Sequence, residues 1–170
     1  VYTDGTIEKT YNSASIHGEI SNDNSTAGCY IGGIVLNANG TIKNCYNSGE
    51  IIVKPKLGYS DAGGIARIFV SGSIENCYNS GNIDVTISHM QKNYGFGGIV
   101  GNISGTNNNL NNVYNTGKII INGENNSEAT CCVGGVSGKN SGKINNSYNV
   151  GKIEIVGSTE NNNIIIGGIL

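Results

Sequence analysis

The stretch GTIKNCYNSGEI, residues 40–51, decides the fold, because close variants of it return along the whole chain. Two pairs of residues mark each copy. The Tyr-Asn pairs begin at Tyr11, Tyr46, Tyr78, Tyr114 and Tyr148, and successive tyrosines are 35, 32, 36 and 34 residues apart. The Gly-Gly pairs end at Gly33, Gly64, Gly98, Gly135 and Gly168, with spacings of 31, 34, 37 and 33 residues. Both anchors therefore indicate five repeats of slightly variable length, which is typical of a repeat architecture.

The repeats divide the chain at about residues 1–39, 40–71, 72–106, 107–141 and 142–170. We expect them to form one β-solenoid segment that is part of a longer chain. The first repeat is the least regular, since Lys9 and Thr10 stand where the second repeat has Asn44 and Cys45. All length differences fall before or after the Gly-Gly pair, so we expect the insertions to project as loops from corresponding corners.

The composition of the 170-residue chain is unusual, with no Trp, one Pro, 27 Gly, 28 Asn and 25 Ile. Such Gly and Asn content is compatible with disorder, but the isoleucines recur at fixed positions, which indicates an ordered fold. The net charge of −2 and the lack of a Lys/Arg cluster argue against a nucleic-acid partner. The segment has no apolar run of about 18 residues or more, so we expect no membrane insertion.

Each repeat contains three short alternating runs, Gly-x-Ile-x-Asn, Gly-x-Ile-x-Val and x-Gly-Gly-Ile. Alternation with period two predicts β-strands, and no segment keeps helical spacing. One unit cannot bury its apolar side chains alone, whereas stacked coils pair each strand in parallel with its equivalent about 4.8 Å away. The sequence therefore predicts an all-β fold, a parallel β-helix (β-solenoid) with three short strands per coil and about five coils, right-handed by the crossover rule.

Aligning the repeats predicts four apolar columns that run through the core. The first two columns are Ile7, Ile42, Ile74, Leu110 and Ile144, and Ile16, Ile51, Ile83, Ile119 and Ile153. The other two are Ile31, Ala62, Phe96, Val133 and Ile166, and Ile34, Ile65, Ile99, Val136 and Ile169. Such columns make a continuous core. Each large aliphatic side chain in it stabilises the fold by roughly 1.5–3 kcal/mol when it is buried.

Two polar columns accompany the apolar ones. The asparagines of the Tyr-Asn pairs should stack their amides along the axis, as in cross-β assemblies; they are Asn12, Asn47, Asn79, Asn115 and Asn149. The tyrosines either face outward, as a flat strip on which sugar rings could stack, or form a stacked ladder that closes a corner of the coil. We favour the structural ladder. The direction depends on whether a turn near Asn44 reverses the alternation that begins at Ile42.

The cysteines have a structural and a chemical interpretation. Cys45 and Cys77 occupy one column in adjacent coils, at a Cα separation that suits a disulfide. Stacked parallel neighbours point the same way, however, so we favour a buried thiol ladder and keep the disulfide as the alternative. Cys29 and Cys131 share a column but lie three coils, about 14 Å, apart. No further metal ligands lie at a suitable spacing from Cys131, so we expect neither a metal nor a cofactor.

The phrase GGIVGN at residues 97–102, followed after a spacer by Gly-x-Ile-x-Asn-Cys/Ser-Tyr-Asn-x-Gly, resembles the Glug repeat. Glug repeats occur in large bacterial cell-surface proteins, including some zinc peptidases that cleave immunoglobulin A, so the resemblance implies an extracellular or cell-surface location. It brings no catalytic residue, since such a peptidase needs His-Glu-x-x-His and neither His17 nor His89 has that context. A weaker likeness is to the passenger repeats of chlamydial polymorphic outer-membrane proteins, whose partner motif Phe-x-x-Asn is missing here.

We do not expect this segment to be an enzyme. Its four aspartates are not paired as glycoside hydrolysis or calcium-assisted cleavage requires, and Arg67 has no acidic neighbour in the sequence. The expected function is a non-catalytic structural stalk or adhesin region of a bacterial surface protein, whose variable loops contact a host protein or glycan. One alternative is a subunit that stacks end to end with copies of itself into an extracellular fibre. The other is a carbohydrate-binding or carbohydrate-active β-helix.

Overall fold

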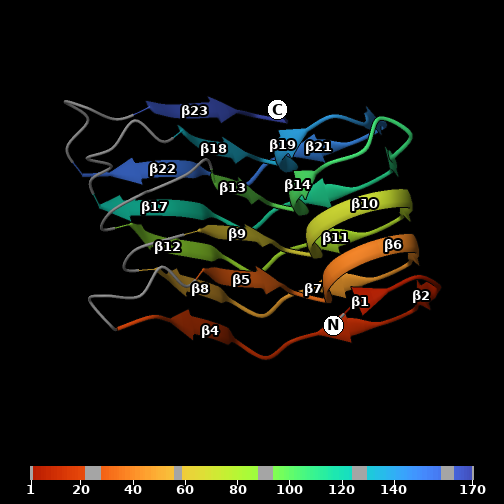
Figure 1. The fold of residues 1–170 in the computed structure, drawn as a ribbon, viewed down its shortest axis with the longest axis horizontal. Helices are drawn as coiled ribbons and strands as arrows, with labels where there is room; N and C mark the ends of the chain where they lie inside the picture. Colours follow the sequence, from red (N-terminus) through yellow and green to blue (C-terminus); the bar gives the residue numbers. More distant parts are fainter. Residues whose placement is uncertain are drawn as a thin grey trace.

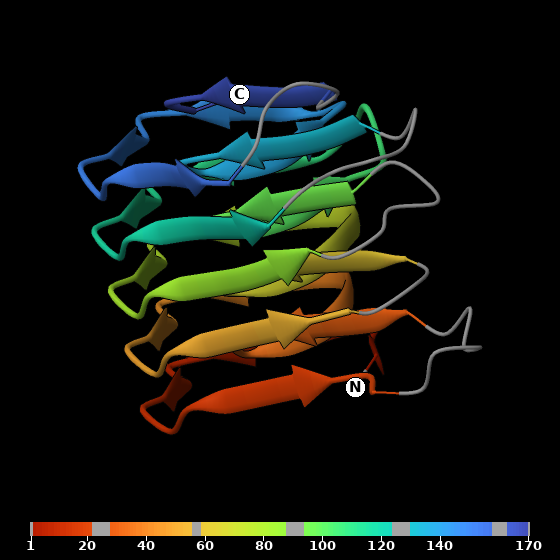
Figure 2. The same ribbon diagram turned by 90° about the vertical axis from the view of Figure 1, so that its left-hand side faces the viewer.

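The computed structural model describes residues 2–21, 28–55, 59–87, 94–123, 130–157 and 163–169. These residues form β-strands and turns without a helix, and the parallel strands stack into a β-solenoid of about four turns (Figure 1). The described residues accordingly contain no helix that could cross a membrane. Figure 2 shows the coils lying one above another, with the two termini at opposite ends of the stack.

The coils contribute strands to four parallel sheets, which we name A to D. Sheet A contains β1 (Tyr2–Thr3), β2 (Thr6–Glu8), β6 (Val35–Lys43), β10 (Ala66–Glu75), β14 (Val100–Ile103), β15 (Asn109–Asn111), β19 (Ser137–Asn140) and β20 (Lys143–Asn145). Sheet B contains β3 (Tyr11–Asn12), β7 (Tyr46–Asn47), β11 (Tyr78–Asn79), β16 (Tyr114–Asn115) and β21 (Tyr148–Asn149). Sheet C contains β4 (Ile16–Glu19), β8 (Ile51–Lys54), β12 (Ile83–Ile87), β17 (Ile119–Gly123) and β22 (Ile153–Val156). Sheet D contains β5 (Cys29–Gly32), β9 (Ser60–Gly63), β13 (Tyr94–Gly97), β18 (Thr130–Gly134) and β23 (Asn163–Gly167).

A coil thus passes through four sheets, whereas the sequence predicts three strands per coil. One reason is that each Tyr-Asn pair forms a two-residue strand of its own between two turns. The other is that the x-Gly-Gly-Ile run is divided by a corner. Its first glycine, such as Gly63, ends a strand of sheet D, and the second, such as Gly64, begins the turn into sheet A.

The predicted register is confirmed in all four apolar columns. In the second and third repeats, Ile42 pairs with Ile74 in sheet A, and Ile51 pairs with Ile83 in sheet C. Phe96 pairs with Val133 in sheet D. The fourth column lies at the corner between sheets D and A, where the amide of Ile65 donates a hydrogen bond of 2.9 Å to the carbonyl of Ile99. The interior members of these columns are buried, so the core is continuous along the stack.

Length differences between repeats fall at two places, as predicted. The first is the connection from sheet C to sheet D, which comprises residues 20–28, 55–59, 88–93, 124–129 and 157–162. The second lies within sheet A. There β6 and β10 are continuous strands of 9 and 10 residues, whereas the next repeat has extra residues and divides into β14 and β15. The extra residues therefore leave the registers of sheets B, C and D unchanged.

Candidate functional site

Each coil turns sharply at the residue that lies two positions before the tyrosine of the Tyr-Asn pair. The turn residue has a left-handed conformation, with φ between 48° and 55°; the five residues are Lys9, Asn44, Asn76, Asn112 and Asn146. Asparagine tolerates this conformation better than most residues that have a Cβ atom. The turn reverses the alternation that begins at Ile42, so the next tyrosine faces outward and its asparagine faces inward. Asparagine recurs at this position in four of the five repeats, but the recurrence alone does not distinguish a left-handed turn residue from a residue of the strand.

The five outward tyrosines form one stacked ladder, which we call the tyrosine ladder. Neighbouring ring centroids are 5.0–5.2 Å apart, with angles of 3–7° between ring planes. The three inner rings are half-buried between their neighbours, while the outermost, Tyr11 and Tyr148, are 62% and 49% exposed. The ladder is therefore both outward-facing and self-stacked. Because the ring faces cover one another, mainly ring edges remain for a ligand, and the inner rings offer no free face to a sugar.

The inward asparagines form a second ladder directly behind the tyrosines. Nδ2 of Asn47 donates to the carbonyl of Gly49 and to Oδ1 of Asn79, both at 2.8 Å. Asn79 makes the same two bonds to Gly81 and Asn115. The side chains of the three inner asparagines are completely buried. Each amide thus joins its own corner to the next coil by buried hydrogen bonds, which stabilise the stack.

The second glycine of each Gly-Gly pair packs against this asparagine ladder. A Cβ atom on Gly64 would lie 2.4 Å from Cγ of Asn79, and one on Gly98 would lie 2.5 Å from Cγ of Asn115. The two sequence anchors are therefore in contact, since each glycine makes room for the asparagine of the next repeat. This contact is not apparent from the repeat pattern. Its one sequence signal is the nearly constant number of residues between a Gly-Gly pair and the Tyr-Asn pair of the following repeat.

A cluster of charged side chains lies at the outer corner between sheets D and A. Nη2 of Arg67 contacts Oδ2 of Asp61 at 3.0 Å, and the guanidinium lies over the ring of Tyr30, 3.9 Å from its centroid. Nη1 of Arg67 also donates to Asn37, and Lys139 approaches Asp61 at 3.8 Å. Arg67 has no acidic neighbour in the sequence, but the Gly-Gly corner brings Asp61 beside it in space.

Glycines form the floor of this corner in the third and fourth repeats. A Cβ atom on Gly95 would lie 2.3 Å from the carbonyl oxygen of Gly101, and one on Gly138 would lie 2.4 Å from the amide nitrogen of Phe96. The side chain of Lys139 passes over Gly95 to reach Asp61, and the amide of Gly95 donates to Asp61 at 2.9 Å. The charged cluster therefore joins neighbouring coils on the outside of the corner.

All five cysteines of the chain carry free thiols in the structure. The amide of Cys45 donates to Sγ of Cys77 at 3.4 Å, and that thiol donates to the carbonyl of Glu75 at 3.2 Å. Burial raises the pKa of Cys77 to about 12, and burial also raises the pKa of Cys131 to about 12. Both thiols therefore stay protonated at neutral pH, and neither has the depressed pKa that a nucleophilic cysteine needs.

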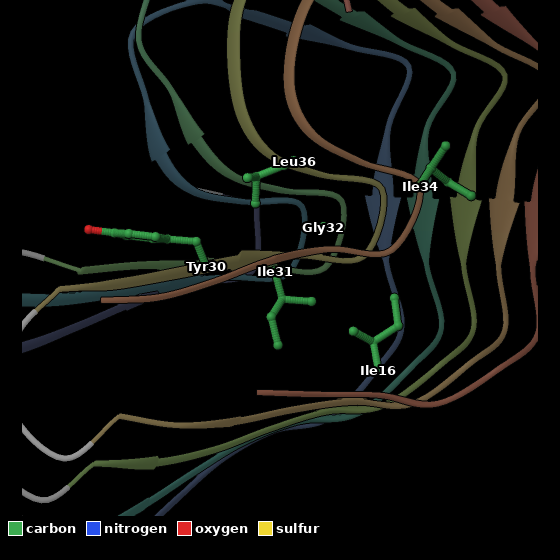
Figure 3. A pocket seen from close by; sticks show the side chains of 6 residues that line it. All are labelled: Ile16, Tyr30, Ile31, Gly32, Ile34 and Leu36. Atoms are coloured by element: carbon green, nitrogen blue, oxygen red, sulfur yellow. The ribbon is translucent and has the colours of Figure 1, made fainter. Parts of the chain in front are cut away.

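A hollow of about 290 Å³ lies at the edge of the stack formed by β4 and β5. Figure 3 shows Ile16 and Ile31 on its inner side, with Tyr30 and Leu36 on the other side of β5. It is lined by four aliphatic residues, a tyrosine and a glycine, which present no acid–base pair. In the ranges that the structure describes, no group of three or more His, Cys, Asp or Glu side chains is placed to hold a metal ion. The ladders and the charged corner are therefore the features from which a function can be argued.

Comparison of the chain with protein-family models, with curated proteins and with solved structures finds no match. The resemblance to Glug repeats therefore depends on the motif alone.

Proposed function

We propose that this chain is a non-catalytic structural stalk or adhesin region of a bacterial cell-surface protein. The observation that carries the proposal is that the same columns run through every described coil. Backbone pairing, the buried amide ladder and the outward tyrosine ladder each join every repeat to the next. Such a stack has one cross-section along its whole length, and added repeats extend it without changing it. These are the properties that a spacer at a cell surface requires.

The adhesin part of the proposal concerns the connections from sheet C to sheet D. In every repeat such a segment joins a strand of sheet C to a strand of sheet D, and the five segments differ in sequence; most of their residues lie outside the described ranges. Five non-identical segments that join the same two sheets suit a multivalent contact with a host protein or glycan, since avidity raises the overall affinity without strong single contacts.

The test begins with an antibody raised against the 170-residue chain. We expect the antibody to label intact cells of the source bacterium, and to detect on a denaturing gel a polypeptide several times larger than 17.7 kDa. Labelling only after lysis would contradict the surface location. Binding of the purified chain to host matrix proteins and glycans, compared with a variant in which the sheet C to D connections are exchanged for Gly-Ser linkers, then separates adhesin from spacer.

Three finer features belong to the same proposal. We infer a right-handed coil, because parallel strands joined by crossovers are right-handed in nearly all known cases. We infer five coils, because sheets B, C and D each contain five strands. We also assign the repeats to the Glug type on the motif described above. A crystal or cryo-EM structure measures the first two directly, and a left-handed coil would contradict the first.

The alternative of end-to-end assembly is favoured by one specific observation. The first and last described coils carry the same residue types in most columns, as at Ile7 and Ile144 and at Ile16 and Ile153. One copy could therefore continue the columns of another, burying these side chains. A natural polypeptide close to 17.7 kDa, together with concentration-dependent growth of the purified chain into fibres, would favour this alternative over the stalk.

A further inference from the structure

We propose that the tyrosine ladder is an oxidative cross-linking site, at which a haem peroxidase and hydrogen peroxide join neighbouring tyrosines as dityrosine. The cross-links would fasten each coil covalently to the next. This inference does not depend on the stalk or adhesin function, because it concerns only the geometry and chemistry of the ladder.

The geometry supplies pairs of phenols that are already in contact. Tyr46 and Tyr78 have ring centroids 5.0 Å apart and an interplanar angle of 3°, and the same values hold for Tyr78 and Tyr114. These pairs are brought together by in-register backbone pairing in sheet B, although 32 and 36 residues separate them in the sequence. Rings two coils apart are about twice as far from each other, with a third ring between them. Coupling should therefore occur only between adjacent repeats.

The ring edges are open to an oxidant. The ladder is on the outside of the solenoid, and its inner rings are half-buried, so part of each ring remains exposed. Burial and then the neighbouring Tyr148 and Tyr78 raise the pKa of Tyr114, so the phenol is neutral near pH 7 and loses a proton together with its electron. Two stacked rings must rotate about their Cα–Cβ and Cβ–Cγ bonds from a face-to-face to an edge-to-edge arrangement to bring their ortho carbons together, and the outward position of the ladder leaves one side open for this movement.

The reaction balances with one equivalent of peroxide for each cross-link. The peroxidase removes one electron and one proton from each of two phenols, and these reduce hydrogen peroxide to two water molecules. The two phenoxyl radicals form one carbon–carbon bond between ring positions ortho to the oxygens. The two ortho hydrogens then move to the phenol oxygens, which restores aromaticity. Two tyrosines and one hydrogen peroxide thus give one dityrosine and two waters.

The experiment treats the 170-residue chain at low concentration with a haem peroxidase and limiting hydrogen peroxide, isolates the monomer and maps cross-links by mass spectrometry. Trypsin separates the five ladder tyrosines into five peptides, since a Lys or Arg lies between each pair in the sequence. We expect four kinds of link in the sample, one for each pair of tyrosines in adjacent repeats. A monomer without dityrosine, or with links between distant repeats as often as between adjacent ones, would overturn the proposal.

The variant Tyr78→Phe provides the sharper test, because phenylalanine keeps the stacked ring but cannot form a phenoxyl radical. We expect loss of the 46–78 and 78–114 links, while the 11–46 and 114–148 links remain. The control Tyr30→Phe changes an exposed tyrosine outside the ladder and should keep all four links. A link between Tyr46 and Tyr114 in the Tyr78→Phe protein, with unchanged circular dichroism and unfolding, would show that coupling does not follow the ladder and would overturn the proposal.

Discussion

At the scale of single residues, the solenoid depends on side chains whose polar groups are satisfied by the next coil. The amide of Asn79 is the clearest case, because it accepts from Asn47 and donates to Gly81 and Asn115 without contact with water. A buried donor or acceptor that loses its partner costs about 1–3 kcal/mol. One substitution in this ladder therefore affects three repeats at once.

We expect Asn79→Ala to lower the free energy of unfolding by about 3 kcal/mol, because it leaves buried groups of Asn47 and Asn115 without partners. Urea unfolding followed by circular dichroism measures this loss. The matched control is Ser80→Ala, at the exposed neighbouring position, which should change stability by less than about 0.5 kcal/mol. Equal effects of the two substitutions would show that the amide ladder contributes little.

The buried thiol of Cys77 predicts a loss of stability at alkaline pH. Because burial raises its pKa in the folded state to about 12, its contribution is complete below about pH 9 and is lost as pH rises toward 12. At pH 11 the loss should be about 2–3 kcal/mol. The variant Cys77→Val has no thiol and carries the residue found at the equivalent position of the next repeat, Val113. Its free energy of unfolding should not show the decrease that is due to ionisation of Cys77. Urea titrations at pH 8 and pH 11 test it, and an identical decline in both proteins would contradict it.

At the scale of elements, the positions of the strands and corners depend on the glycines as much as on the isoleucines. The first glycine of each pair allows a tight corner, since a Cβ atom on Gly97 would lie 2.0 Å from the carbonyl oxygen of Val100. The second glycine allows contact with the asparagine ladder. These glycines fix where sheet D ends, and the strand that follows begins in the same register in every coil.

The glycine corner can be tested with two equivalent positions of the same column. A Cβ atom on Gly98 would lie 2.1 Å from the carbonyl oxygen of Gly135, whereas one on Gly168 has nothing within 4 Å. We therefore expect Gly98→Ala to cost about 3 kcal/mol or more, and Gly168→Ala less than about 0.5 kcal/mol. Thermal and urea unfolding of both variants measure the difference. Similar stabilities would mean that the corner adapts to a side chain.

The apolar columns give a prediction for the strands themselves. Ile83 in β12 lies in the second column and is fully buried between Ile51 and Ile119. We expect Ile83→Ala to cost about 2–5 kcal/mol, because it removes apolar contacts and leaves a cavity between coils. Thr86→Ala, at an exposed position of the same strand, is the control. A loss below about 0.5 kcal/mol for Ile83→Ala in urea unfolding would contradict the assignment of this column.

The elements also show what the sequence could and could not predict. Isoleucines at constant spacing predict four core columns and their parallel register, because every coil must bury the same positions. The outward direction of Tyr46 depends on the left-handed conformation of Asn44; the asparagine recurs in the sequence, but its conformation cannot be read from that recurrence. The contact of Lys139 with Asp61 joins residues 78 positions apart through a corner floored by glycine, so only the three-dimensional path of the chain reveals it.

At the scale of the whole molecule, stability should be a sum over coils and the interfaces between them. Residues 77–112 span one complete repeat between equivalent positions, since Asn76 and Asn112 are both left-handed turn residues. We expect a chain that lacks residues 77–112 to fold as a shorter solenoid, with lower stability and a smaller urea m-value. Deletion of residues 77–94 removes half a coil, breaks every column and should abolish cooperative unfolding. Circular dichroism and urea titration distinguish these outcomes.

The amide ladder gives the whole molecule a polarity. The four bonds that join the five asparagines from Asn12 to Asn149 all run in one direction, each donated by Nδ2 of one rung to Oδ1 of the next toward the C-terminal end. The side-chain dipoles therefore add along the axis, as in an electret, and each bond polarises the next. A rung placed before Asn12 would have to donate to it, and a rung placed after Asn149 would have to accept from it. Any coil or copy that joins the stack must arrive in the same sense, because an inverted one would place like groups against each other.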